Sequence, residues 1–409
     1  MSTHPRAAAP DLAAVADAGP GANSLVPAAF LALGTFAIGT EGFMIAPLLA
    51  TMAADFGMTV PHVALLVVVF TLTMAVSSPV ATVLTARLRR RSVLLLAMTV
   101  FTAGNLLAAW SPSFAILMTA RIMMAVASGL YVPNANALAG AIAPAGKRGR
   151  ALAIVSGGMT LAIALGLPLG GVVGHAFGWR ATFLAVGALS VIAIAGILAG
   201  IVRDAGAGIP VATLSQRLAV TRQPAILRLL AVSLFWSAGA YAAYPYIAPY
   251  LAQVLGLGPV GINATVSMWG LAAAFGVMTG GTLNDRFGSH RVAGLSLLVL
   301  ALAFWGLGLS ALGLSPHAAM VPVLAAVAAW GFSVWSFFPA QMARLMAAGS
   351  ASQASLALAL NTSTMYLGFS LGSALGAAIL GTGAIWGIGL FAGACEIVAL
   401  ALNRRATRA

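Results

Sequence analysis

The stretch from Gly281 to Gly288 reads Gly-Thr-Leu-Asn-Asp-Arg-Phe-Gly and separates two long apolar segments. These segments lie at about 262–283 and 291–314, and each is long enough to cross a bilayer, which takes about 20 helical residues. A similar string, Leu84-Thr85-Ala86-Arg87, follows an earlier apolar segment. Because the two strings stand at corresponding places in the two halves of the chain, we expect a repeated membrane architecture.

The composition is that of a membrane protein. Only 7% of the 409 residues are charged, against about 25% in soluble domains, and 61% are hydrophobic. A soluble protein of this size could not cover its surface with so few charges. A cytosolic enzyme, a disordered chain and a secreted scaffold are therefore excluded. The one cysteine, Cys395, excludes an intrachain disulfide and a cysteine-based metal site.

Twelve apolar segments are long enough to span the membrane. They lie at about 25–50, 60–84, 92–111, 113–142, 150–174, 178–202, 225–252, 262–283, 291–314, 317–347, 352–380 and 383–403. The predicted fold is an all-α membrane protein with twelve transmembrane helices in two pseudo-symmetric six-helix bundles. The expected parts are a disordered cytoplasmic tail over 1–24, a bundle over 25–202, a cytoplasmic linker over 203–224, a bundle over 225–403 and a cytoplasmic tail over 404–409.

Basic residues lie almost entirely on one side of the predicted membrane. If the N-terminus is cytoplasmic, eighteen of the 20 Lys and Arg residues fall in cytoplasmic segments, Arg180 falls outside, and Arg121 lies within a span. This distribution follows the positive-inside rule and predicts a multi-pass protein of the cell inner (plasma) membrane with both termini cytoplasmic. It also accounts for the net charge of +13 without a nucleic-acid partner.

The polar turn carries a family resemblance. Its pattern, G-x-L-x-D-R-x-G at a cytoplasmic turn between two spans, resembles the signature of the major facilitator superfamily. The positions that carry this pattern are Gly281, Asp285, Arg286 and Gly288. The first copy keeps Arg87 but has Ala86 in place of the expected acid. The resemblance implies a gating role for this motif and two bundles that rock about a central site.

Span five resembles the antiporter motif of the drug–proton exporters. The positions concerned are Gly158, Gly166, Pro168, Gly170 and Gly171. Thr40-Glu41-Gly42-Phe43 in span one and Tyr246-Ile247-Ala248-Pro249 in span seven resemble the arabinose- and chloramphenicol-exporter branch of the superfamily. This resemblance runs from about residue 25 to the end of the chain, and it implies proton-driven export of a small molecule.

Charged residues inside spans are costly to bury, so each one suggests a function. We expect Glu41, in span one, to bind and release the coupling proton; the alternative is a structural acid paired with a neighbouring hydroxyl or Arg. Arg121, in span four, either attracts a polar substrate and holds Glu41 charged or ties two helices together. Glu396, in span twelve, is interpreted as an acid that reaches the cytoplasmic interface.

Polar side chains follow one face of span seven. Ser233, Ser237, Tyr241 and Tyr244 fall within a stripe about 80° wide, with Trp236 beside it. We expect this face to line the substrate cavity, because polar atoms in a membrane helix line a cavity or a helix contact. The packed helix contact is the alternative. Further cavity residues are expected at Ser128 and Asn136 in span four and at Asn361 in span eleven.

The sequence therefore predicts a transporter that exports a small amphipathic molecule in exchange for protons. The substrate classes implied by the resemblance are a drug such as chloramphenicol and a sugar-like metabolite. We expect no catalytic residue, no metal and no cofactor, since the proton gradient supplies the energy; the partners are substrate, protons and the bilayer, and the protein is expected to act as a monomer. The rivals are an uptake symporter or uniporter of the same fold and, in another class, a membrane enzyme or sensor.

Overall fold

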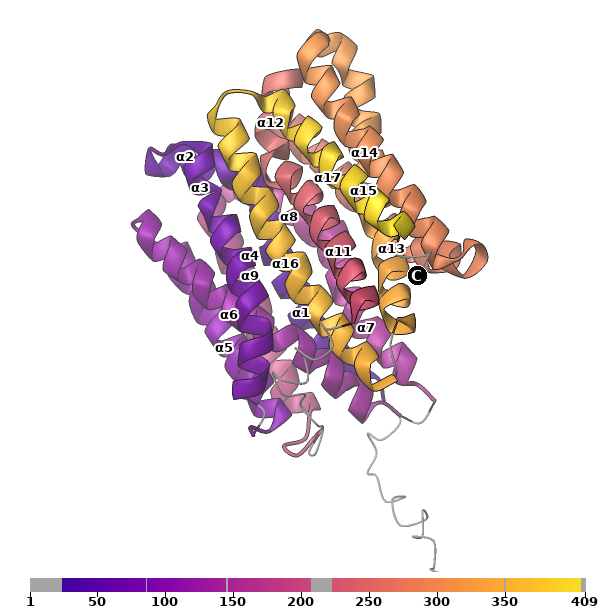
Figure 1. Ribbon diagram of the computed structural model, residues 1–409. Helices are drawn as coiled ribbons and strands as arrows, with labels where there is room; N and C mark the ends of the chain where they lie inside the picture. Colours follow the sequence, from indigo (N-terminus) through magenta and orange to yellow (C-terminus); the bar gives the residue numbers. More distant parts are fainter. Residues whose placement is uncertain (1–23, 86, 145, 207–222, 349–350, 406–409) are drawn as a thin grey trace, which may run out of the picture.

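A computed structural model describes residues 24–85, 87–144, 146–206, 223–348 and 351–405 of the chain (Figure 1). The predicted tails over 1–24 and 404–409 and the predicted linker over 203–224 lie largely outside these ranges, as does Ala86. The division of the chain at the linker therefore stays a prediction. Within the described ranges the secondary structure is helical throughout, with no strand.

In the described part of the chain, twelve helical spans are long and apolar enough to cross a membrane, which confirms the predicted fold class and makes this a multi-pass membrane protein. In the first half the elements are α1 (Val26–Met44), η1 (Ala46–Leu48), α2 (Leu49–Phe56), α3 (Val60–Val63), α4 (Leu65–Leu84), α5 (Arg90–Ala109), α6 (Phe114–Ile142), α7 (Arg148–Leu161), η2 (Ala162–Gly166), α8 (Leu167–Phe177) and α9 (Trp179–Gly200). In the second half they are α11 (Pro224–Ala243), η3 (Tyr244–Tyr246), α12 (Ile247–Leu255), α13 (Pro259–Phe287), α14 (Ser289–Gly313), α15 (Pro316–Ala347), α16 (Ala351–Gly381) and α17 (Ile385–Arg405).

The first and seventh spans are broken in the same way. Each long helix gives way to a short 3-10 turn, η1 or η3, that contains a proline, and a second helix then continues. Proline removes a backbone N–H and so interrupts the helical ladder. The second helix ends in each span at a left-handed glycine, Gly57 (φ 63°) and Gly256 (φ 65°). This shared break is structural evidence for the repeat.

Helix packing repeats between the halves as well. In the first half α5 packs on α6 and α9, and α1 packs on α7 and α9. In the second half the corresponding contacts are α14 on α15 and α17, and α11 on α16 and α17. Two six-helix bundles with the same internal arrangement result. In Figure 1 the first bundle is indigo to magenta, and the second runs from rose-red at α11 through orange to yellow.

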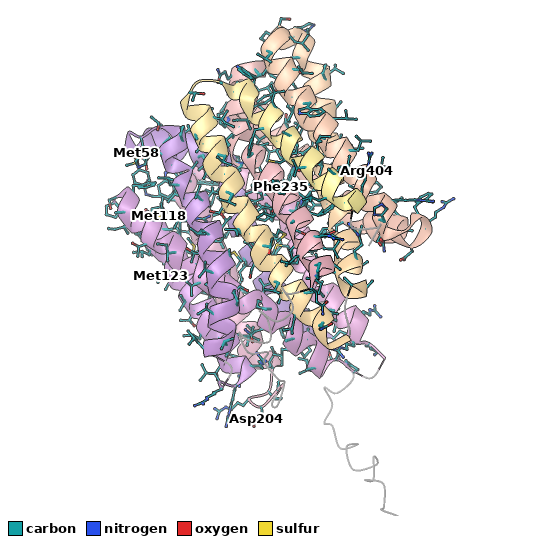
Figure 2. The ribbon with its side chains drawn as sticks, viewed as in Figure 1. Met58, Met118, Met123, Asp204, Phe235 and Arg404 are labelled. Atoms are coloured by element: carbon teal, nitrogen blue, oxygen red, sulfur yellow. The ribbon has the colours of Figure 1, made fainter. Side chains whose placement is uncertain are left out.

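The seam between the bundles runs along two helix contacts. One joins α4 to α16, which lie side by side in Figure 1, and the other joins η2 and α8 to α13. We call the end of the molecule that holds the turns near residues 57–59 and 256–258 the Arg-poor end. The opposite end, with the turns near 87–89 and 288, is the Arg-rich end. Figure 2 shows Met58 and Asp204 at these two opposite ends of the first bundle.

The sides of the bundles expose large apolar residues, among them Leu72, Val76 and Leu302. A soluble monomer rarely exposes so extended an apolar surface. In a bilayer these side chains face lipid, while the helices satisfy their backbone hydrogen bonds internally. The interior of each bundle is therefore where buried polar and charged groups can lie.

Candidate functional site

Glu41 and Arg121 form an ion pair inside the first bundle. Glu41 lies on α1 and Arg121 on α6, and each residue is 0% exposed. The Arg121 guanidinium also lies over the ring of Phe70 on α4, 4.0 Å from its centroid, in a cation–π contact. The pair therefore joins three helices of the first bundle.

Burial makes the two charges dependent on each other. Removing one partner of a buried pair typically costs about 3–5 kcal/mol, because the other charge is left uncompensated. Arg121 keeps its charge, whereas a carboxylate can accept a proton. Protonation of Glu41 would thus break the pair without removing either side chain. The arrangement supports both the proton-carrier interpretation and the helix tie as expected roles of these residues.

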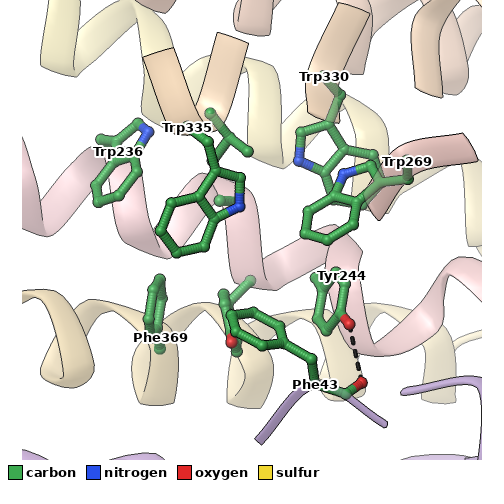
Figure 3. A pocket seen from close by; sticks show the side chains of 10 residues that line it. Phe43, Trp236, Tyr244, Trp269, Trp330, Trp335 and Phe369 are labelled. Carbon is green, nitrogen blue, oxygen red and sulfur yellow. Dashed lines mark hydrogen bonds between the residues drawn. The ribbon is translucent and has the colours of Figure 1, made fainter. Parts of the chain in front are cut away.

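An aromatic pocket lies at the junction of the two bundles (Figure 3). It is lined almost entirely by the second bundle, through α11, η3, α13, α15 and α16, and α1 adds one side chain. The lining residues are Phe43, Trp236, Ala240, Tyr241, Tyr244, Trp269, Trp330, Val334, Trp335 and Phe369. We refer to this set as the aromatic pocket.

The pocket is bounded toward the Arg-poor end by contacts between the two bundles. The Tyr244 hydroxyl donates a 2.9 Å hydrogen bond to the carbonyl oxygen of Phe43, drawn as a dashed line in Figure 3. The two rings meet edge to face with centroids 5.8 Å apart. The Ser370 hydroxyl donates a 3.0 Å bond to the carbonyl oxygen of Val68. These bonds join the bundles on the Arg-poor side of the pocket.

The ion pair and the pocket are neighbours. Glu41 lies two residues before Phe43 on α1, so the same helix carries the acid and the first-bundle wall of the pocket. On the other side, Tyr241 of the pocket lies within electrostatic range of Arg121. The charged pair and the pocket are therefore linked through α1 and through Tyr241.

The structure brings three of the expected cavity residues together and separates the others from them. Trp236, Tyr241 and Tyr244 line the pocket. Ser233 and Asn361 instead hydrogen-bond to each other at 2.5 Å between α11 and α16, and the Ser237 hydroxyl donates to the Ser233 carbonyl. Their polar atoms are occupied by protein groups. The packed helix contact, left open as the alternative, describes these three residues.

The two cavity residues expected on span four also lie away from the aromatic pocket. The Ser128 hydroxyl donates a 2.8 Å bond to the Met124 carbonyl of its own helix, and Ser128 is buried. Asn136 donates to the Val132 carbonyl at 3.1 Å and is half-buried. Their spacing along α6 indicates only that Ser128 and Asn136 share one face of that helix. The pocket lies mostly in the other bundle.

The glycines of the antiporter helix form a close-packed seam. A Cβ atom at Gly158, Gly166 or Gly170 would collide with α1, and one at Gly171 would collide with Asn263 of the other bundle. Before Pro168 the helix forms a π-type turn, η2, where the missing proline N–H loosens the regular ladder. The motif thus lets α1 and α13 approach α7–α8 from opposite sides.

The gating motif lies at the Arg-rich end of α13. Gly288 has φ 83° and ends the helix, a backbone conformation that favours glycine. Gly281 has open space where a Cβ would stand. Asp285 and Arg286 are exposed, and so is Arg87 in the first copy. Among the ion pairs of the described ranges, none involves these three charged residues.

Glu396 corrects an expectation. It does not reach the membrane interface: it is 0% exposed, and α17 continues beyond it to Arg405. Its carboxyl oxygen lies against Gly239 of α11, where a Cβ would come within 2.7 Å of it. Within the described part of the chain neither carboxyl oxygen has a hydrogen-bond partner. The interfacial interpretation failed because α11 covers this face of α17.

Sequence reasoning missed most of the pocket wall. Trp269 lies on α13, and Trp330 and Trp335 lie on α15, whereas the cavity residues expected from sequence lie on spans four, seven and eleven. A signal was present, since tryptophan in membrane helices is enriched at the interfaces and these residues fall well inside their spans. Tryptophans far from both span ends were thus the available clue to an internal site.

Comparison with known proteins agrees with this architecture. Residues 31–373 match the family model described as Major Facilitator Superfamily. The uncharacterised MFS-type transporter YbcL of Bacillus subtilis (strain 168) is 31% identical over 85% of this chain and 86% of its own. The inner membrane transport protein YdhP of Escherichia coli (strain K12) is 28% identical over 87% and 89%.

Two further similarities bear on function and on fold. A chloramphenicol resistance protein of Streptomyces lividans is 34% identical over 67% of this chain and 71% of its own. Among solved structures, a bacterial homologue of the human lysosomal transporter Spinster, in an inward-facing and occupied conformation, matches with a TM-score of 0.75. That match covers 96% of this chain and 98% of the other at 17% identity, and it concerns the fold alone.

Proposed function

Because this chain belongs to the major facilitator superfamily of membrane transporters, we propose that it exports a small amphipathic molecule in exchange for protons. The observation that carries this proposal is the buried Glu41–Arg121 pair beside the aromatic pocket. One group can take up a proton, and the pocket offers a place for an apolar ligand close to it.

Competition between proton and ligand gives the coupling. Glu41 carries the proton, and its protonation releases Arg121 from the pair. Because Glu41 and Phe43 lie on one helix, a shift of α1 upon protonation changes the wall of the pocket. Proton and ligand then favour different arrangements of the same elements, which is the requirement for exchange.

The two bundles rock about this site. The bonds from Tyr244 to Phe43 and from Ser370 to Val68 close the Arg-poor side, so export requires that they break and that the Arg-rich side closes instead. The glycine seam on α7–α8 supports such movement, because packed glycines let helices slide at close distance.

The Arg distribution supports a cytoplasmic location for the Arg-rich end and for both termini in the cell inner (plasma) membrane. A drug such as chloramphenicol and a sugar-like metabolite are the proposed substrate classes. The first has support from the name of the Streptomyces lividans relative. The expected working unit is a monomer without cofactor or metal.

The direct test uses proteoliposomes with an imposed pH gradient. With the interior acidic and the protein inserted with its Arg-rich end outward, labelled chloramphenicol should accumulate inside. Collapse of the gradient with an ionophore should release it. Accumulation only when the gradient is reversed would identify an uptake symporter, and gradient-independent equilibration would identify a uniporter. Either result would overturn the proposed exchange.

A further inference from the structure

Three tryptophans of the aromatic pocket have indole N–H groups without a partner. The side chains are Trp236 on α11, Trp269 on α13 and Trp330 on α15, and they are 2%, 3% and 1% exposed. Across the described part of the chain no hydrogen-bond acceptor reaches any of the three nitrogens. Three different helices thus each place one buried donor in one pocket wall (Figure 3).

The three indole groups offer hydrogen-bond donors and no acceptors. An indole N–H donates and cannot accept. Buried donors are nearly always paired, and a ligand that supplies acceptors removes the penalty of an unpaired one. The nearby Tyr244 hydroxyl donates to the Phe43 carbonyl, and its oxygen accepts from none of the three indoles. A ligand with acceptor atoms would satisfy these donors.

The charge of the ligand follows from the neighbouring side chains. Of the described residues that line the pocket, none is acidic or basic. The nearest charged groups, Glu41 and Arg121, neutralise each other. An anion would find no free cation here, and a cation would find aromatic faces but no free anion. A neutral ligand fits this environment best.

The shape of the ligand follows from the rings. Trp269 and Trp330 meet with centroids 5.6 Å apart, and Trp236 lies 4.7 Å from Phe337. The space left among the lining side chains holds about one water molecule. A ligand therefore has to separate rings, and a flat group does so with the least displacement while it regains their stacking contacts.

We propose that the aromatic pocket selects neutral molecules that combine a planar ring with at least two acceptor oxygens, and that the indole N–H groups of Trp236, Trp269 and Trp330 determine this specificity. This inference rests on the proposed transport function, and it names the substrate class. It distinguishes the pocket from an aromatic cage for organic cations, which would use the faces of the same rings and not their N–H groups.

The test is ligand binding to the purified full chain in lipid nanodiscs, measured by equilibrium dialysis without a proton gradient. Two neutral probes carry a ring and acceptor oxygens: chloramphenicol and p-nitrophenyl β-galactoside. A third, tetraphenylphosphonium, is an aromatic cation without acceptors. We expect at least one neutral probe to bind wild type more tightly than the cation does. Each of Trp236→Phe, Trp269→Phe and Trp330→Phe should weaken that binding about threefold to tenfold, because each keeps an aromatic ring and removes one donor.

Trp305→Phe is the matched control. The Trp305 N–H already donates to the Leu390 carbonyl, at 3.3 Å, between α14 and α17 and outside the pocket. This variant should bind the neutral probe as wild type does. Thermal unfolding of every variant checks that the fold is retained.

Three results would overturn the inference: neither neutral probe binds wild type, the three pocket variants bind the neutral probe unchanged, or tetraphenylphosphonium binds more tightly than both neutral probes. Failure of the proposed export appears separately. It would leave this binding pattern intact while removing gradient-driven accumulation in proteoliposomes.

Discussion

Glu41 and Glu396 are both fully buried acids, one in the first span and one in the last, yet their surroundings differ. Glu41 is paired with Arg121, while the described residues give the carboxyl oxygens of Glu396 no hydrogen-bond partner. Glu396 lies against the backbone of Gly239, in a contact between two packed helices. The comparison teaches that two acids can be equally buried and still differ in chemistry: only at Glu41 would protonation release a neighbouring charge, and this is why the proposed exchange uses Glu41.

The two bundles also differ in the functional groups that they carry. The first holds the ion pair, and the second supplies nearly all of the aromatic pocket. The repeated architecture therefore carries different chemistry in its two copies. In the proposed exchange, coupling between proton and ligand would pass across the seam, at Phe43 and Tyr244.

Glu41→Gln should have the largest effect. It removes the titrating group, so we expect gradient-driven accumulation of chloramphenicol in proteoliposomes to be lost. It also leaves Arg121 as a buried unpaired cation, which should lower stability by about 3–5 kcal/mol. Ligand binding to wild type should weaken as the pH falls and protons compete for Glu41, and this pH dependence should disappear in the variant.

The double variant Glu41→Gln/Arg121→Gln separates stability from coupling. With both charges gone, the thermal midpoint should recover toward the wild-type value, while uphill transport stays absent. Full uphill transport by either variant would show that the carrier lies elsewhere, and Glu396 would then be the acid to test.

Gly239→Ala tests the packing around the second acid. A Cβ there would meet the Glu396 carboxyl oxygen at 2.7 Å and the Ala392 carbonyl oxygen at 2.9 Å. We expect a loss of about 1–3 kcal/mol in thermal or denaturant unfolding, because the helices have to move apart. Gly42→Ala, beside Glu41, is the matched control, since no atom lies within 4 Å of a Cβ at that position. Equal stability of the two variants would contradict the close helix contact at Glu396.

Asp285→Asn tests a difference between the two motif copies. We expect Asp285 and Arg286 to tie the Arg-rich end of α13 to the first bundle when the protein faces outward. An exposed contact of this kind stabilises the outward-facing state by about 1 kcal/mol. Its loss would shift the population about fivefold toward the inward-facing state and slow export. The amount of protein in the membrane should not change. Arg87→Gln, in the copy without the acid, should have a smaller effect, and unchanged transport in Asp285→Asn would refute the gate.

Glu396→Gln should have the smallest effect. It has nearly the same shape, and it leaves no charged partner unpaired among the described residues. We therefore expect stability to change by less than about 1 kcal/mol and gradient-driven export to continue. Loss of coupling in Glu396→Gln, together with normal coupling in Glu41→Gln, would reverse the assignment of the two acids.

The fold was predictable from sequence to a large extent. Length and hydropathy alone identified the twelve spans, because a lipid environment demands long apolar helices whatever their neighbours are. The glycine pattern of span five resembled an antiporter motif, and the structure shows what it does locally, since Gly158, Gly166 and Gly170 lie against α1. Glu41 and Arg121 stood out because charges inside spans are rare.

The candidate site was less predictable, because periodicity reports a direction around a helix and not the partner on that side. Ser233, Ser237, Tyr241 and Tyr244 share the predicted stripe on span seven, yet the serines pack against helices and the tyrosines line the pocket. The same limit applies to Glu396. Its distance from the end of its helix does not reveal that α11 packs over it.

The sequence by itself determined the membrane class, the number of spans, the repeat and the presence of an acid and an Arg within the first bundle. Each of these depends on local composition or on spacing along one helix. The tertiary structure alone decided that Glu41 meets Arg121, that Glu396 finds no hydrogen-bond partner among the described residues, and that tryptophans from three helices converge on one pocket. The physical reason is that in an apolar medium nearly every face of these helices is compatible with burial, so hydropathy does not specify which faces meet. Close packing of particular side chains, and of glycines in particular, makes that choice.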